Sequence, residues 1–227
     1  MAGTARREGA TDETGRYAVL YPALAEAAHR VGATAIGLID VGRPAALNLC
    51  VDRVGITYSD GVFLGHPDSP VQEDCSIVHG GSVPDRAMPP VVARVTVTRR
   101  RPDVEDALLA EDPPVRFCGD VVELLPEAIA AVPEDALPVV TTTWALSRLV
   151  IPRRPSFVDR LREAAGKRTV AWVSAEGVGV APSVPTLGDR PASGHSIVGI
   201  ALYEGAEQRV DAVARCWSRG RILDWFH

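Results

Sequence analysis

Short apolar runs of strand length alternate with helical segments along most of this chain, and this alternation restricts the possible folds more than any other feature. Strands of a parallel sheet are near-continuous apolar runs, whereas helices carry apolar residues every three or four positions. We therefore expect a parallel sheet with helices on both faces. The expected strands are residues 34–41, 90–98, 115–119, 137–144 and 169–175, and the expected helices are residues 17–31, 45–53, 103–109, 121–131 and 155–165.

Two further strand-like runs, residues 196–203 and 209–217, are separated only by the short segment 204–208. This spacing predicts a hairpin, which would add an antiparallel edge to the sheet. The segment 55–90 is rich in Gly, Pro, Asp and Ser and indicates loops with short strands. The expected fold is therefore α/β, a Rossmann-like class I methyltransferase fold with a mostly parallel sheet and a C-terminal antiparallel hairpin.

The composition is typical of one globular domain of ordinary size. The chain has 227 residues, a hydrophobic fraction of 46% and a formal net charge of −5, and this negative charge disfavours nucleic acid or anionic lipid as a partner. Residues 1–16 form a polar tail without the apolar core of a signal peptide. No apolar run approaches the roughly 20 residues that span a bilayer. We expect a cytoplasmic protein with one domain at residues 17–227.

Several segments resemble the bacterial family known as domain of unknown function 2332. The run IDVGRPAALNLCVDR, residues 39–53, resembles the family signature E-x-G-x-S-A-G-L-N-L followed by D-R. Other matching segments are GDVVELLP, VVTTTWALSRL, AWVSAEG, GDRPASGHSIVGIAL and RGRILDW, and together they cover most of residues 18–226. The resemblance implies a methyltransferase-like fold, but the family has no established activity.

The chain departs from this family at the loop after the first expected strand. The small-residue loop becomes Arg43-Pro44-Ala45-Ala46, which lacks the second Gly of the pattern. In S-adenosylmethionine enzymes this loop lets the backbone approach the cofactor, and a side chain there occupies the space. We therefore expect no cofactor, and S-adenosylmethionine only if the protein is a conventional methyltransferase.

Two other departures concern the ends of the family pattern. The family's H-P-H-G appears here as residues 217–220, WSRG, so the histidines are absent. The N-terminal helical region is nearly absent, and the helical insertion between residues 98 and 113 is reduced. Core surface exposed by such losses is normally covered, which predicts a second protein subunit as a partner.

Five residues are candidates for catalysis. Arg43 precedes an expected helix, whose N-terminus attracts anions, and its guanidinium suits carboxylate, sulfate or phosphate. Asp40 and Asp120 follow core strands, where methyltransferases place acids that hold ribose and adenine. Glu176 also follows a strand, and His195 in GDRPASGH could be a general base. Each has a plainer interpretation: a solvent-facing arginine, a helix cap or loop hydrogen bond, or a structural histidine.

The same strand ends supply the expected substrate-binding residues, which are Gly42, Asn48, Trp144, Ser147 and Arg190. Trp144 could stack on a substrate or pack in the core. The remaining histidines and the four scattered cysteines show no metal-ligand spacing, so no metal is expected. Ser147 lacks the flanking pattern of a nucleophile elbow, which disfavours a hydrolase triad.

These residues leave three hypotheses of different classes. The first is a small-molecule tailoring enzyme of bacterial specialised metabolism, in which a substrate amine displaces sulfate or phosphate and closes a ring. Arg43 would stabilise the departing anion, and Asp40, Asp120 or Glu176 would deprotonate the amine. The second is an S-adenosylmethionine-dependent methyltransferase. The third is a non-catalytic subunit of a heteromeric enzyme.

Overall fold

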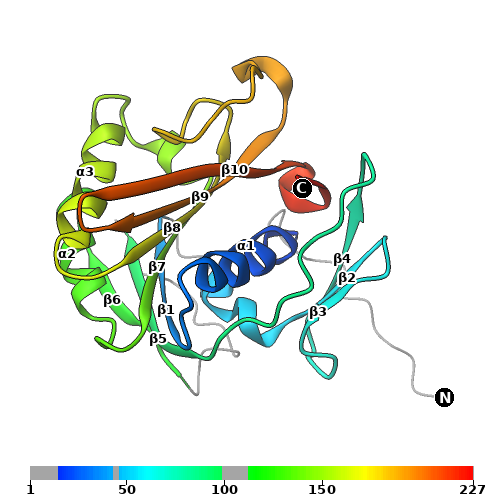
Figure 1. Ribbon diagram of the computed structural model, residues 1–227, viewed down its shortest axis with the longest axis horizontal. Coiled ribbons are helices and arrows are strands. Elements are labelled where there is room, and N and C mark those ends of the chain that lie inside the picture. The colour runs from blue at the N-terminus through cyan, green and yellow to red at the C-terminus, as the bar shows by residue number, and fades with distance from the viewer. Residues whose placement is uncertain (1–14, 43–45, 99–111, 227) are drawn as a thin grey trace.

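A computed structural model describes residues 15–42, 46–98 and 112–226, and it shows one large mixed sheet with helices packed against both faces (Figure 1). Arg43 and the helix expected at residues 103–109 lie outside the described residues. The strands are β1 (Ile36–Val41), β2 (Gly55–Tyr58), β3 (Phe63–Gly65), β4 (Gln72–Ile77), β5 (Val91–Thr98), β6 (Val115–Cys118), β7 (Leu137–Thr143), β8 (Val170–Gly177), β9 (Ser196–Glu204), β10 (Glu207–Trp217) and β11 (Ile222–Trp225). The α-helices are α1 (Arg16–Arg30), α2 (Val121–Ala130) and α3 (Arg153–Ala165), and the 3₁₀ helices are η1 (Ala46–Arg53), η3 (Leu146–Arg148), η4 (Pro191–Ser193) and η5 (Ser218–Gly220).

The sheet follows the order β3-β2-β4-β11-β10-β9-β8-β7-β1-β5-β6. From β6 to β8, each strand is parallel to its neighbour. The chain then turns back through β9, which is antiparallel to β8 and to β10. The expected mixed α/β architecture, with a mostly parallel sheet and an antiparallel C-terminal pair, is confirmed at this level.

The hairpin β9–β10 exists, but its expected position at the edge of the sheet is wrong. The strand β11 pairs antiparallel with β10 and parallel with β4, so β4, β2 and β3 continue the sheet beyond the hairpin. Pairing of β4 with β11 joins residues about 145 positions apart, as in the hydrogen bond from Cys75 to Gly220. A contact so distant in the chain leaves no local pattern in the sequence.

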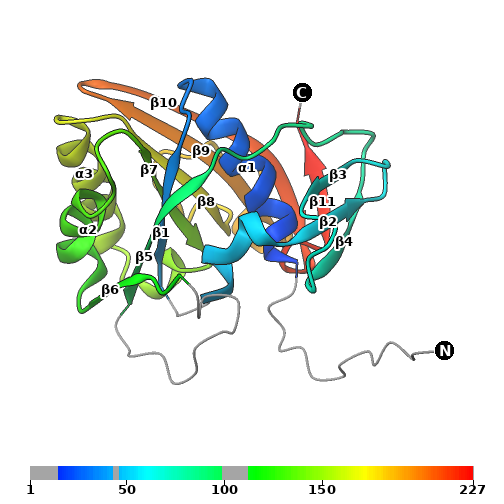
Figure 2. The same cartoon turned by 90° about the horizontal axis from the view of Figure 1, so that it is seen from below.

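Helices cover the two faces of the sheet and separate two apolar cores. The helix α1 lies between the parallel strands and the β2–β3–β4 region (Figures 1 and 2), while α2 and α3 pack on the opposite face. Because side chains alternate along a strand, Leu38 and Val139 contribute to the core under α1, whereas Val140 and Trp172 contribute to the core under α2 and α3. The expectation of helices on both faces is therefore confirmed.

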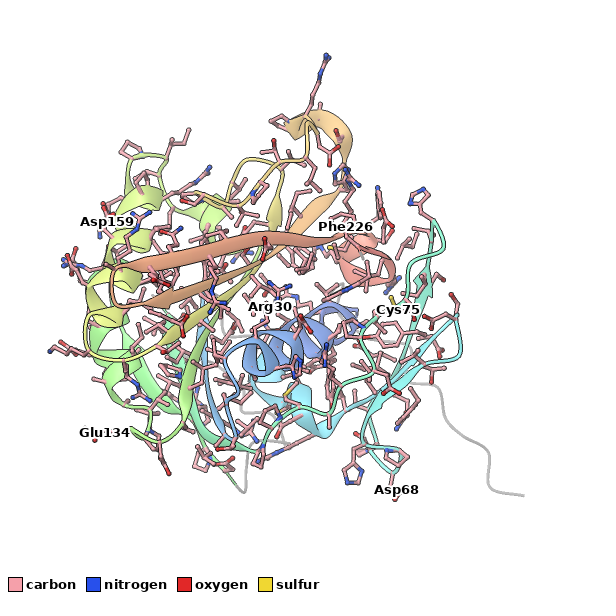
Figure 3. All side chains as sticks on the ribbon, in the orientation of Figure 1. Arg30, Asp68, Cys75, Glu134, Asp159 and Phe226 are labelled. Carbon is pink, nitrogen blue, oxygen red and sulfur yellow. The ribbon has the colours of Figure 1, made fainter. Side chains whose placement is uncertain are left out.

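The helix α1 contains a proline, and a distant tyrosine compensates for it. Pro22 has no N–H to donate to the carbonyl of Ala18, four residues earlier. The buried hydroxyl of Tyr58 in β2 donates to that carbonyl at 2.7 Å. At the far end of α1, Arg30 forms an ion pair of 2.8 Å with Asp211 of β10, and Figure 3 shows Arg30 where the helix approaches this strand. These contacts fix α1 between the two parts of the sheet.

Two element boundaries near the carboxyl ends of β1 and β7 differ from the expected ones. The segment expected as an α-helix at residues 45–53 is the 3₁₀ helix η1, Ala46–Arg53, among the described residues. Arg16, assigned to the polar tail, is the first residue of α1 and is only 9% exposed. The residues that precede Arg16 are polar and those that follow it are apolar, so only the tertiary contacts assign Arg16 to the helix.

Candidate functional site

The carboxyl ends of β1 and β7 and the start of α1 meet at one edge of the sheet. Asp40 is the penultimate residue of β1, Trp144 directly follows β7, and Arg16 begins α1. The two strands are parallel neighbours, with Val41 opposite Thr142. Ligands of such sheets bind at this edge, and the sequence analysis places its candidates here for the same reason.

A buried polar cluster occupies this edge on the face covered by α1. Asp40 is 2% exposed, and its Oδ1 accepts a hydrogen bond from the Thr141 hydroxyl at 2.9 Å and from Asn48 Nδ2 at 3.2 Å. Asn48 Nδ2 also donates to the Thr143 hydroxyl at 2.9 Å. The strand β7 and the helix η1 thus hold the Asp40 carboxylate from two sides.

Trp144 makes the turn that follows β7. Its φ of 51° lies in the left-handed region, which a bulky residue adopts only when its surroundings require it. Its indole Nε1 donates to the hydroxyl of Ser196 at 2.8 Å, and the Arg16 guanidinium lies 5.2 Å from the centre of its ring. Trp144 therefore connects the start of β9 with the start of α1, and its backbone strain is stored beside the polar cluster.

A small hollow of about 10 Å³ lies between these groups, lined by Arg16, Asp40, Val41, Asn48, Thr143, Trp144, Ala145 and Arg148. A space of this size holds about one water molecule. Its lining includes the oxygen-bearing side chains of the buried Asp40, Asn48 and Thr143, which we call its inner wall. Arg16, which is 9% exposed, and the exposed Arg148 complete the polar lining. The side chain of the exposed Arg148 forms no hydrogen bond or ion pair with any part of the chain that the structure describes.

Gly42 follows β1 at the position where a methyltransferase loop would approach its cofactor. Its φ is 127°, and a Cβ atom placed on it would lie 2.8 Å from the Cβ atom of Ala145. The space directly above the Gly42 backbone is therefore filled by the loop after β7. Within the described residues, the Gly42 backbone thus packs against a protein methyl group.

Glu176 is buried on the other face of the sheet. It belongs to β8 rather than following it, which corrects its expected position, and its face is that of Trp172. Its Oε1 accepts the backbone N–H groups of Ala145 and Leu146 at 2.9 and 3.0 Å, so it caps η3. Burial raises the pKa of Glu176 to about 7, against the opposing effect of these N–H groups.

Asp120 caps the helix α2. Its Oδ1 accepts the N–H of Val122 at 2.9 Å and lies 2.5 Å from Nη2 of Arg153 in α3. Partial burial raises its pKa, but the N–H of Val122 and the Arg153 guanidinium outweigh burial and lower the pKa overall. The strand β5 separates β6 from β1, so Asp120 and Asp40 follow strands that are not neighbours in the sheet.

His195 belongs to a separate ionic network around Trp217. Its Nε2 lies 2.9 Å from Asp189 Oδ2, and its ring centre lies 5.3 Å from that of Trp217. The Arg215 guanidinium donates to the same Asp189 oxygen at 2.7 Å. The hydrogen bond from Arg215 lowers the pKa of Asp189 most strongly, and the contact with His195 lowers it further. The structure thus pairs His195 with a carboxylate, and His195 does not line the hollow, although the next residue, Ser196, contacts Trp144.

The other two expected substrate-binding residues are exposed. Ser147 lies in η3, and its hydroxyl donates to the Trp144 carbonyl at 3.2 Å. Arg190 precedes η4, in the long loop between β8 and β9. Neither residue lines the hollow.

The helix η1 is anchored by a buried arginine that sequence reasoning missed. Arg94 in β5 is 5% exposed, and its guanidinium donates to both carboxylate oxygens of Asp52, at 2.9 and 2.8 Å. It also donates to the Leu49 carbonyl and pairs with Asp112 at 2.6 Å. Arg94 therefore holds the helix that carries Asn48.

The sequence analysis also missed Arg16, Thr141, Thr143 and Arg148 as members of this site. The two threonines alternate along β7 on the face of Val139, so strand periodicity could have placed them beside Asp40. Arg148 ends the short helix η3, four residues after Trp144, and no sequence periodicity predicts its direction.

The described residues contain neither a cluster suited to a metal ion nor a helix suited to a membrane. Within the described residues, no three or more His, Cys, Asp or Glu side chains gather as a metal site would require. No helix in the same residues is long and apolar enough to cross a membrane. Cys50, Cys75 and Cys216 are buried, as expected for small apolar residues, whereas Cys118 is exposed.

Fold and site together define an α/β protein with a polar site at the carboxyl edge of its parallel strands. The chain belongs to the family described as "Uncharacterized protein conserved in bacteria (DUF2332)", which matches residues 1–108 and 98–225. No curated protein and no solved structure matches it. The resemblance noted from the sequence is therefore confirmed at the level of the family.

Proposed function

We propose that this protein is a tailoring enzyme that acts on a small molecule without S-adenosylmethionine, on a scaffold related to the class I methyltransferases. The order β6-β5-β1-β7-β8 of its parallel strands supports the choice of scaffold. The proposed reaction is an intramolecular displacement, in which an amine of the substrate expels sulfate or phosphate and a ring closes. The observation that carries this proposal is the hollow where Arg16 and Arg148 lie beside the buried carboxylate of Asp40.

The two arginines supply the site for the leaving group. A guanidinium binds sulfate or phosphate through two parallel N–H groups. Arg148 is exposed and has no side-chain partner among the described residues, so its donors are available to an incoming anion. The anion would lie at the margin of the hollow, because the hollow itself admits only one water-sized group.

The proposed step forms one bond and breaks one bond. The amine nitrogen bonds to the carbon that bears the leaving group, and the carbon–oxygen bond breaks with its electron pair going to the sulfate or phosphate. The proton released by the amine passes to Asp40, the only one of the three candidate acids that lines the hollow. Holding both ends of one molecule and stabilising the departing anion are the two sources of rate enhancement.

The contact of Gly42 with Ala145 supports a reaction without S-adenosylmethionine. The backbone of Gly42 is approached by a protein methyl group instead of by a cofactor. A methyltransferase would require the loop after β7, which carries Ala145, to move away from Gly42. Only the strand order favours this alternative.

The third hypothesis, a non-catalytic subunit, is favoured by one observation. Val150 and Ile151, between η3 and α3, are 68% and 72% exposed beside the candidate site. Apolar side chains that project so far from the surface are typical of a contact with another protein. A partner at this position would also be compatible with the proposed enzyme, because it would lie next to Arg148.

Calorimetric titration of the purified protein tests the proposal, with any co-purifying partner retained. We expect no binding of S-adenosylmethionine or S-adenosylhomocysteine at micromolar concentration, and measurable binding of ethyl sulfate. Arg148→Gln should raise the Kd for ethyl sulfate about tenfold. Arg209→Gln, in the exposed part of β10, is the matched control and should leave the Kd unchanged. Micromolar binding of S-adenosylmethionine, or equal ethyl sulfate binding in both variants, would overturn the proposal.

A further inference from the structure

We propose that Oδ1 of Asn48 receives the amino group of the substrate, which makes the substrate class a primary amine that carries a sulfate or phosphate ester. This inference rests on the proposed function and adds the group that the inner wall of the site recognises. It is carried by the hydrogen-bonding state of one side chain and by the size and lining of the hollow.

The Asn48 amide is held in one orientation and is only half satisfied. Its Nδ2 donates to Asp40 and to Thr143, at 3.2 and 2.9 Å, which identifies this end of the amide as the nitrogen. Asn48 is 4% exposed, and its Oδ1 has no hydrogen-bond partner among the residues that the structure describes. A buried acceptor without a donor is unfavourable by about 1–3 kcal/mol. The carbonyl oxygen is therefore available for a donor that enters the hollow.

The size of the hollow restricts what that donor can be. A space of about 10 Å³ admits a single group as large as a water molecule. An amino group is of this size, whereas a carboxylate or a sulfate is much larger. The inner wall carries the Asp40 carboxylate and the oxygens of Asn48 and Thr143, so it favours a group rich in donors.

A primary amine satisfies this wall in the form that reacts. One N–H would donate to Asn48 Oδ1 and the other to the Asp40 carboxylate, while the lone pair remains directed at the substrate carbon. A hydroxyl group has one donor and cannot satisfy both oxygens. The two arginines would hold the ester group of the same molecule. The site would thus bind the amine through acceptor oxygens and the anionic ester through cationic donors.

A pair of ligands tests this inference by calorimetry. The probe is 2-aminoethyl hydrogen sulfate, and ethyl sulfate is the same molecule without the amine. We expect the native protein to bind the amine at least tenfold more tightly than ethyl sulfate. Asn48→Leu should abolish this preference while the Kd for ethyl sulfate stays within about twofold, because a general loss of structure would weaken both ligands alike.

Two further variants separate recognition from folding. Arg209→Gln changes an exposed residue that does not line the hollow, so the preference for the amine should persist. Asn48→Asp keeps an acceptor but replaces the Nδ2 donor to Asp40 by an oxygen, so the two neighbouring carboxyl groups share one proton. The preference for the amine should persist in this variant, which supplies a second test if Asn48→Leu does not fold. Circular dichroism verifies the fold of each variant.

The outcomes distinguish this inference from the function on which it rests. A native protein that binds both ligands equally, or an Asn48→Leu variant that keeps the preference, would overturn the inference and leave the anion site standing. If the native protein binds neither ligand, both the inference and the proposed function fail. A 2-aminoethyl phosphate titration shows which of the two esters the margin prefers.

Discussion

The Cβ atom of Ala145 lies 2.8 Å from the position that a Cβ atom on Gly42 would occupy. This contact holds the loop after β1 against the loop after β7. The candidate site lies at this contact: Asp40 precedes the first loop, Asn48 follows it, and Trp144 belongs to the second. The absence of a side chain at Gly42 therefore serves the packing of the two loops, where the family resemblance suggested a cofactor.

Substitution of Gly42 by alanine should destabilise the protein by about 1–3 kcal/mol. The new methyl group would overlap Ala145, and the φ of 127° is unfavourable for any L-residue. Gly61→Ala is the control, because Gly61 also has a positive φ, of 94°, but has open space around it. Urea denaturation should show a larger loss for Gly42→Ala, and Ala145→Gly in the same chain should recover part of it. Equal losses at Gly42 and Gly61 would contradict the packing role.

Glu176 should make the protein less stable as the pH rises. Its pKa is about 7 in the folded state, against an ordinary value of 4.5. The folded protein therefore binds the proton more tightly than the unfolded chain, and the stabilising effect, full below pH 4.5, is lost as the pH rises through 7. The effect is about 3 kcal/mol.

Urea denaturation between pH 5 and 8 measures this effect by comparison with Glu176→Gln. The glutamine oxygen can still accept the N–H groups of Ala145 and Leu146, and the side chain does not ionise. The substitution should stabilise the protein at pH 8 relative to the native chain and lose this advantage near pH 5. A difference between the two proteins that does not change with pH would contradict the burial of an ionisable group.

Asp120 should matter for stability and not for ligand binding. Asp120→Ala removes the cap of α2, which should destabilise the protein by about 0.5–2 kcal/mol. Asp120→Asn retains the cap acceptor and loses only the partly exposed ion pair with Arg153, so its effect should be smaller. Because the pKa of Asp120 is lowered in the fold, its contribution should be present at neutral pH and be lost at acid pH. Loss of ethyl sulfate binding in Asp120→Asn would contradict a purely structural role.

Arg94→Met should be the most harmful of these substitutions. It removes a buried cation and leaves the carboxylate of Asp52 without its two donors, and breaking a pair in this way costs about 3–5 kcal/mol. The helix η1 should then lose its attachment to β5. We expect the backbone amides of η1 to exchange hydrogen rapidly in this variant and slowly in the native protein. The amides of α3 should exchange slowly in both. Unchanged exchange in η1 would show that Arg94 does not hold this helix.

The parallel core of the fold could be predicted from the sequence because its signals are local. Each strand from β5 to β9 is an apolar or alternating run within a few residues of its expected bounds, and Gly32 and Gly166 closely follow the ends of α1 and α3. The extension through β11, β4 and β2 could not be predicted, because these strands are short and their pairings join distant segments. The helix at residues 103–109 remains a prediction.

The candidate site could be predicted in part, for the same physical reason. Asp40 and Trp144 end buried strands, and parallel strands bring their carboxyl ends to one edge. Arg16 could not be placed there, because nothing in a polar N-terminal segment indicates that it begins a helix packed on Trp144. The roles expected for Arg43 remain a prediction, as does the choice of Asp40 as the base.

The strand β11 has a consequence for how the chain reaches its native state. Among the residues that the structure describes, it is the only strand that connects the β2–β3–β4 region with the rest of the sheet. During synthesis, β4 emerges about 145 residues before its partner, as the separation of Cys75 from Gly220 illustrates. The nascent chain must therefore carry an unpaired edge on β4 until residues 222–225 have been translated. Because such edges can pair with other chains, this protein has a long interval of exposure to aggregation, and chaperones would act during that interval.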